Sequence, residues 1–193
     1  MDNYQIAEIF SLLSKLLDIN QENNFKAKSY AAAAFNIEKL PVQLIETPHE
    51  KIFQIKGIGE SSGKKIIEIL ETGSLKTLQD LIEKTPIGVI EMLNIKGIGP
   101  KKISTIWKEM EIESIGELLY ACKENRLKLY KGFGEKTQQN VIDTIEFYLS
   151  NQGSYLYPQV EAVEQQITAY LQKLFGAENV FITGTFKRQL EII

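Results

Sequence analysis

A short phrase of lysine and glycine recurs three times along this chain, in a form suited to holding an anion. The copies, each Lys-Gly-x-Gly with an apolar residue at x, are turn one (56–59), turn two (96–99) and turn three (131–134). Glycine accepts positive φ and lets another backbone come close, as a tight turn between helices requires. The N–H groups of such a turn and of the following helix start point outward as an anion site. A phosphate diester fits that chemistry, and each turn carries a lysine beside it.

The elements that must position these turns are short helices. The spacing of 40 and then 35 residues between copies indicates one supersecondary unit used several times. Apolar residues lead into the glycines and others follow at helical spacing, as Met92, Leu93 and Ile95 do before turn two and Ile103 and Ile106 after it. Each copy is therefore predicted to be a short helix, a tight turn and a second helix.

This arrangement resembles the helix-hairpin-helix, a module that grips the nucleic-acid backbone without reading bases. The resemblance rests on hydrophobic-x-Gly-hydrophobic-Gly followed by a small or basic residue. It implies a DNA-binding set made of the turn glycines and nearby lysines: Gly57, Gly59, Lys64, Gly97, Gly99, Lys101, Lys102, Gly132 and Gly134. The alternative interpretation is that Gly-x-Gly simply joins two packed helices. A dinucleotide-binding fingerprint fits less well, because it needs a third glycine three residues on, and Gly63 comes four residues after Gly59.

Composition narrows the class of protein. With 193 residues, 44% of them hydrophobic, the chain can bury a core, and its predicted elements are nearly all helices. No segment reaches the uninterrupted apolar length of a membrane span, and no basic stretch precedes an apolar core at the start. We therefore expect an all-α, cytoplasmic protein that does not bind membrane. One cysteine and one histidine leave neither an internal disulfide nor a zinc cluster, and Cys122 is expected in the core.

Charge is distributed unevenly along the chain. The net charge of −3 and the pI near 5.4 count against indiscriminate binding to nucleic acid. Residues 51–110 hold ten lysines against seven acidic residues, whereas residues 1–50 hold four lysines against seven acidic residues. The basic excess thus coincides with turns one and two, and because it is small we expect modest, salt-sensitive affinity for DNA.

Hydrophobic periodicity and turn residues divide the chain into three parts. Residues 1–73 are predicted to form a helical domain with turn one, residues 74–150 a helical domain with turns two and three, and residues 151–193 a further segment. Its elements are expected to be a linker at 150–154, a helix over 160–175 and a short strand over 179–184. In the first domain, helices are predicted over 2–19, 24–39 and roughly 42–46.

The order of these elements resembles the family X DNA polymerases. The first domain looks like their lyase domain, through segments 25–33 and 57–66, and the second is similar to their duplex-binding fingers subdomain, through 97–101 and 132–136. The tail at 183–191 resembles the Gly-Ser-x-Arg-Arg-Gly-x-Glu motif that opens the palm. The resemblance implies tandem helix-hairpin-helix domains followed by a short α/β start of a truncated palm. It also implies an incomplete nucleotide-binding site at three tail residues, Gly184, Thr185 and Arg188.

A lyase site is implied in the first domain. In the family a lysine after the first Gly-x-Gly attacks C1′ of a 5′-deoxyribose phosphate, and the resulting Schiff base releases the sugar by β-elimination. Lys65 falls at that position, and both Lys64 and the helix N-terminus favour a neutral amine there. Lys26 and Tyr30 match residues that hold the 5′-phosphate, so gapped or 5′-phosphorylated DNA is the implied partner. The alternative is that Lys65 is an ordinary solvated lysine.

Metal ions follow from the same resemblance. In the family, carbonyls of the hairpin turns hold K⁺ or Na⁺ between protein and phosphate, and the matching carbonyls belong to Phe53, Ile55, Ile58, Leu93, Ile95 and Ile98. Nucleotidyl transfer needs a carboxylate cluster for two metal ions, and no Asp-x-Asp follows the tail motif up to Ile193. We therefore expect Mg²⁺ only in a full-length polymerase, of which this chain would be an N-terminal fragment that does not polymerise.

Several positions depart from the family pattern. Ser61 replaces a lysine that often contacts the 5′-phosphate, and Thr185, Lys187 and Gln189 replace the serine, the first arginine and the glycine of the palm motif. Two functions therefore stay open. The chain is either the DNA-holding and lyase portion of a DNA repair polymerase, or a non-catalytic helix-hairpin-helix nucleic-acid-binding or scaffold protein derived from a degenerate polymerase. The sequence leaves the oligomeric state and the preferred DNA structure open.

Overall fold

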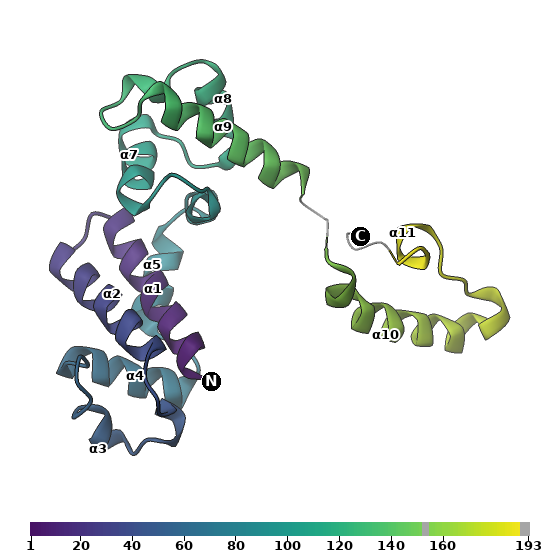
Figure 1. Cartoon of the computed structure of the whole chain (residues 1–193), viewed down its shortest axis with the longest axis horizontal. Helices are drawn as coiled ribbons and strands as arrows, with labels where there is room; N and C mark the ends of the chain where they lie inside the picture. Colours follow the sequence, from purple (N-terminus) through teal and green to yellow (C-terminus); the bar gives the residue numbers. More distant parts are fainter. Residues whose placement is uncertain (152–154, 190–193) are drawn as a thin grey trace. The chain divides into compact units, whose positions relative to one another are not determined.

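Helices make up nearly all the regular structure in the computed structural model, which describes residues 1–151 and 155–189 (Figure 1). The chain divides into two compact units, Met1–Ile145 and Glu146–Ile193. The all-α prediction is confirmed for the described residues, in which no helix is both long and apolar enough to cross a membrane. The division at residue 73 stays a prediction.

The first unit consists of short helices connected by tight turns. Its α-helices are α1 (Asn3–Ile19), α2 (Asn24–Glu38), α3 (His49–Ile52), α4 (Glu60–Thr72), α5 (Lys76–Lys84), α6 (Ile87–Glu91), α7 (Pro100–Met110), α8 (Ile115–Lys123) and α9 (Glu135–Ser150), whose last residues enter the second unit. Its 3₁₀ turns are η1 (Leu44–Glu46), η2 (Met92–Asn94) and η3 (Leu127–Leu129). The predicted helices at 2–19 and 24–39 are confirmed as α1 and α2. The third helix, predicted over roughly 42–46, is only the three-residue 3₁₀ helix η1.

The core of this unit begins with α1 and α2, which lie side by side (Figure 1). Asp2 and Gln5 form a capping box that fixes the start of α1. Buried apolar residues follow at helical spacing along α1, and Phe10 packs edge-on against Tyr30 of α2 with ring centroids 5.9 Å apart. Ser14 donates a buried hydrogen bond of 2.8 Å to the carbonyl of Ala27. Together these contacts hold α2, which carries Lys26 and Tyr30, against α1.

The C-terminal end of α1 is tied to α5 and α7 by polar side chains. Ser104 of α7 donates 2.7 Å to the carbonyl of Ile19 and accepts 3.2 Å from Gln21, which adopts φ +56°. Asn20 donates 2.9 Å to the hydroxyl of Thr85, just after α5. Ser104 and Thr85 are buried and their hydroxyl groups are hydrogen-bonded. These hydrogen bonds hold α7, which carries Lys101 and Lys102, against α1.

After the last residues of α9, the described part of the second unit contains α10 (Tyr157–Phe175), η4 (Ala177–Asn179) and α11 (Gly184–Lys187). The helix expected over 160–175 is confirmed as α10. The strand expected over 179–184 is wrong, since residues 180–183 form no regular element and α11 begins at Gly184. A strand needs a neighbour to accept its backbone hydrogen bonds, and the described part of this unit is built of helices. The predicted linker at 150–154 falls partly at 152–154, outside the described residues.

Candidate nucleic-acid interface

The three glycine turns share one backbone geometry. Their first glycines, Gly57, Gly97 and Gly132, have φ of +89°, +99° and +91°, values that L side chains rarely adopt. In each turn the residue between the glycines donates its N–H to the carbonyl three residues earlier. These bonds are Ile58 to Ile55 at 3.0 Å, Ile98 to Ile95 at 3.4 Å and Phe133 to Tyr130 at 3.1 Å. The repeated sequence therefore builds the same turn three times, with its first glycine required by the backbone.

The second glycine of each turn is not required by the fold. Gly59 and Gly99 have φ of −81° and −98°, ordinary values for the residue before a helix. A Cβ added at Gly59, Gly99 or Gly134 would meet no atom within 4 Å. Gly59 and Gly99 precede α4 and α7 without capping the helix by a side chain, although Ser or Asp is favoured there. A bare backbone at these helix starts leaves room for a ligand to approach their N–H groups.

Turns two and three lie next to each other. Lys102 of α7 places its Nζ 3.5 Å from the carbonyl oxygen of Gly97 and 5.5 Å from the ring centroid of Phe133, the residue between the glycines of turn three. Lys101 is exposed beside it. A cleft of about 380 Å³, lined in part by Lys96, Gly97 and Asn140, separates turn two from α9. The structure thus brings together the lysines and glycines of two turns, from segments more than thirty residues apart in sequence.

Turn one has a different set of neighbours, contributed by α2 and α5. The buried side chain of Tyr30 reaches from α2 to α4, where its hydroxyl lies 3.3 Å from the Oγ of Ser61. Lys65 is half-buried, with its Nζ 5.7 Å from the Tyr30 ring centroid and donating 2.8 Å to the Oγ1 of Thr77. Lys26 is exposed on α2, one turn before Tyr30. Of the predicted lyase residues, Tyr30 and Lys65 are therefore close together.

Lys64 and Lys65 have separate surroundings although they are adjacent. Lys64 is exposed and forms an ion pair of 2.7 Å with Glu60, which lowers the pKa of that carboxyl group through the hydrogen bond and the charge of Lys64. Lys65 instead turns toward Tyr30 and Thr77. Successive helical residues point about 100° apart, which accounts for the difference.

The predicted cation ligands are neutral backbone carbonyls. Among the described residues no group of three or more His, Cys, Asp or Glu side chains is arranged to hold a metal ion. In turns one and two the carbonyls of Ile55 and Ile95 already accept the turn hydrogen bond with one lone pair, which leaves a second lone pair. Uncharged carbonyl oxygens suit a monovalent cation, so the donor set fits K⁺ or Na⁺.

The tail residues form a separate segment in the second unit. Gly184 begins α11 with φ +67°, Thr185 follows within that helix, and Arg188 is exposed just beyond it. Gln189 has φ +50°, a left-handed conformation that favours glycine, so the palm motif has a glycine where this backbone also prefers one. Positions 190 and 191 of the motif lie outside the described residues.

Two polar side chains near turn one were not predicted from the sequence. Asn36 of α2 donates 3.2 Å to the carbonyl oxygen of Gly57, and Thr77 of α5 accepts from Lys65. Both are ordinary polar residues of helices with no motif around them. Only the packing of α2 and α5 beside α4 brings them to the turn, so the sequence gives no local signal for either.

Comparison with known proteins agrees with this geometry. A family model described as a helix-hairpin-helix domain matches residues 1–75, and one described as a SAM-like helix-hairpin-helix tandem matches residues 89–146. The chain is 25% identical over 145 residues to the DNA polymerase/3′-5′ exonuclease PolX of Bacillus subtilis (strain 168), and 26% identical over 150 residues to DNA polymerase lambda of Rattus norvegicus. Each alignment covers 75% of this chain and 25% of the relative.

A shorter match links the chain to a different enzyme. Over 59 residues it is 46% identical to a DNA ligase of Clostridium novyi (strain NT), which covers 31% of this chain and 9% of the ligase. The fold and these matches define a tandem helix-hairpin-helix protein. Over 75% of its length the chain is similar to PolX and to DNA polymerase lambda, which agrees with the resemblance of its sequence to the family X DNA polymerases. The chain spans about a quarter of the length of these two polymerases.

Proposed function

We propose that this chain binds the sugar–phosphate backbone of DNA through its three glycine turns. The observation that carries the proposal is the second glycine of each turn, which precedes a helix and where an added Cβ would have no protein atom within 4 Å. The fold gives no reason for glycine there, whereas a phosphate approaching the helix N–H groups does. Lys101 and Lys102 beside turn two add charge, and such contacts position a protein on DNA without reading bases.

Fluorescence anisotropy with labelled duplexes at low salt tests this proposal. The double variant Lys101→Glu/Lys102→Glu is expected to weaken binding to every sequence about tenfold or more, because four charge units change beside the turn. The matched control is Lys15→Glu/Lys39→Glu, which makes the same change in net charge on α1 and just after α2. If both double variants lose the same DNA affinity, the effect comes from net charge and not from the lysines beside turn two. If wild type binds no DNA at all, the scaffold alternative is favoured.

The preferred DNA is proposed to be a gap that carries a 5′-phosphate. The support lies at turn one, where Tyr30 and Ser61 place two hydroxyl groups 3.3 Å apart and Lys26 is exposed on the same helix as Tyr30. Hydroxyl and ammonium groups are suitable donors to a terminal phosphate. Gapped duplex with a 5′-phosphate should then bind better than the same gap without it.

A second candidate function is 5′-deoxyribose phosphate lyase activity with Lys65 as the nucleophile. It is favoured by the position of the Lys65 amine beside Tyr30 and by a hydrogen bond to Thr77 that orients the amine. Borohydride reduction should trap wild type covalently on DNA bearing a 5′-deoxyribose phosphate, and Lys65→Ala should remove most of the adduct. Lys64→Ala is the control, because that lysine pairs with Glu60 and faces elsewhere. If gap binding is intact but nothing is trapped, the chain is a binding module.

Monovalent cations are proposed to join the turns to phosphate. The ligands would be the carbonyls of Phe53, Ile55 and Ile58 in turn one and of Leu93, Ile95 and Ile98 in turn two. DNA affinity at constant ionic strength should then be higher in K⁺ or Na⁺ than in a bulky organic cation. Nucleotide binding at Gly184, Thr185 and Arg188 stays a prediction, as does the expectation that Mg²⁺ acts only in a full-length polymerase.

A further inference from the structure

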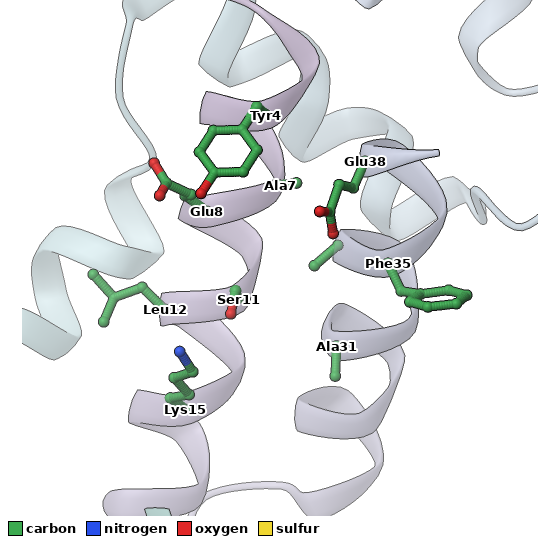
Figure 2. A pocket seen from close by; sticks show the side chains of 10 residues that line it. Tyr4, Ala7, Glu8, Ser11, Leu12, Lys15, Ala31, Phe35 and Glu38 are labelled. Atoms are coloured by element: carbon green, nitrogen blue, oxygen red, sulfur yellow. The ribbon is translucent and has the colours of Figure 1, made fainter. Parts of the chain in front are cut away.

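An elongated groove runs between α1 and α2, and none of the residues proposed for DNA lines it. Its volume is about 680 Å³. Small side chains line its floor, Ala7 and Ser11 from α1 and Ala31 and Ala34 from α2. Figure 2 shows Ala7, Ser11 and Ala31 on the two neighbouring helices. Because these side chains are short, the floor is low between the two helices and allows the side chains of a third helix to approach closely.

Large apolar side chains stand around this floor. Tyr4 and Phe35 are 59% and 56% exposed, and Leu12 is half-buried on α1. Single exposed hydrophobic residues are normal on protein surfaces, whereas several around one groove indicate an interaction site. The groove therefore offers apolar surface on its floor and its rim.

The two ends of the groove differ in charge. Glu8 and Glu38, on facing helices, lie toward the end with Tyr4, whereas Lys15 lies toward the other end (Figure 2). Glu8 raises the pKa of Tyr4 through its charge and its hydrogen bond, and Glu38 adds to the same effect. Paired carboxylates repel phosphates, so this groove is unsuited to nucleic acid and suited to a partner with basic groups at one end.

The length of the groove suits about three turns of helix. Tyr4 and Lys15 are eleven positions apart on α1, which corresponds to about 16 Å at 1.5 Å per residue. An amphipathic helix docks in such grooves through apolar anchors at i, i+3 or i+4 and i+7. We propose that the groove between α1 and α2 binds an amphipathic α-helix of a partner protein, with apolar anchors on the floor and lysine or arginine residues against Glu8 and Glu38.

This site is separate from the proposed DNA contacts. Ala31 follows Lys26 by five residues on α2, so their side chains point about 140° apart around the helix axis. The two proposed sites therefore have no residue in common. A variant that loses helix binding can therefore be distinguished from one that loses DNA binding.

A displayed library of 18-residue amphipathic peptides, randomised at apolar and charged positions, tests the proposal on the full chain. Peptides are selected on wild type and counter-selected on Ala31→Arg, which blocks the groove at an exposed helical position. The selected peptides should share apolar anchors at i, i+3 or i+4 and i+7, with basic residues at one end. Phe35→Ala and Glu38→Lys should each weaken their binding about tenfold.

The matched controls lie outside the groove. Phe25 is 83% exposed at the start of α2, so Phe25→Ala removes the same side chain elsewhere on that helix, and Glu22→Lys makes the same charge change in the preceding loop. Both should leave peptide binding unchanged, and Phe35→Ala should leave DNA anisotropy unchanged. The proposal is overturned if no peptide survives counter-selection, or if the selected peptides ignore both groove substitutions. Self-association that Phe35→Ala abolishes would overturn it in favour of a second copy.

Discussion

Turns one and two have the same backbone but different support from the protein around them. At turn one the side chain of Asn36 packs against Gly57. Its Nδ2 donates a hydrogen bond to the carbonyl of Gly57 and fills the space that a Cβ added to this glycine would need. The matching position at Gly97 has no atom within 4 Å. The features that the turns share are the positive φ and the open helix start, and those that differ are the neighbouring helices. The open helix start that the two turns share therefore faces outward, as a ligand common to both turns would require.

The largest effect is expected from alanine at the first glycines. Gly57→Ala and Gly97→Ala both force a side chain into positive φ, at a cost of about 1–2 kcal/mol in the free energy of unfolding. Gly57→Ala should cost about 1 kcal/mol more, because the new methyl group displaces Asn36 and breaks its hydrogen bond. Thermal and urea unfolding measure both values.

A double mutant isolates the source of that difference. In an Asn36→Ala background the hydrogen bond and the crowding are already gone, so Gly57→Ala should cost about as much as Gly97→Ala does in wild type. An unchanged excess at Gly57 would mean that Asn36 does not distinguish the two turns.

Serine at the second glycines should separate stability from binding. Gly59→Ser and Gly99→Ser meet no steric obstacle and supply the capping hydroxyl that α4 and α7 lack, so the free energy of unfolding should stay equal or rise by a few tenths of a kcal/mol. DNA affinity should fall about tenfold, or about 1.4 kcal/mol, because the hydroxyl occupies the path of the phosphate. If both variants keep the DNA affinity of wild type, the second glycines are not needed to make room for a phosphate.

A smaller effect is expected at Tyr30 and should be confined to turn one. Tyr30→Phe removes the hydroxyl that lies beside Ser61 and leaves the ring packed against Phe10. The preference for a 5′-phosphorylated gap should drop about threefold, or about 0.7 kcal/mol, with intact-duplex affinity unchanged. Anisotropy with the two DNAs measures the ratio. An equal loss of affinity for the gapped and the intact duplex would mean that turn one does not recognise the 5′-phosphate.

The smallest signal comes from Cys122, which is buried in α8, between turns two and three in the sequence. Burial raises the pKa of its thiol to about 11, so alkylation of the folded protein should be slow and should accelerate as pH rises toward that value. Gly97→Ala should increase the rate a few-fold by favouring local opening of this region, and Gly57→Ala should change it less. Equal acceleration by both would show that the two regions open together.

Sequence reasoning succeeded where the signal was local. The helices at 2–19 and 24–39, the three turns and the buried Cys122 all follow from periodicity, glycine positions and composition. It failed for the strand at 179–184, because an apolar stretch of that length fits a strand or a loop, and only a pairing partner decides between them.

The contacts around the candidate site could not be predicted for another reason. The Lys102–Phe133 and Tyr30–Ser61 contacts each join segments about thirty residues apart, and they depend on the angles at which short helices pack. Ser61 stands out in the sequence only as a departure from the family pattern, yet it meets the Tyr30 hydroxyl. A motif indicates which residues matter, whereas packing decides which of them meet.

Helix α1 also sets a length scale. Near its start, Asn3 bonds to Val42 and Leu44, in the segment that leads to turn one, and just past its end Gln21 bonds to Ser104 in the helix that follows turn two. Its 17 residues span about 26 Å, close to the rise of eight base pairs. One helix of fixed length thus separates the segment before turn one from the helix after turn two. A duplex bound along both parts of the chain would have to match this fixed length.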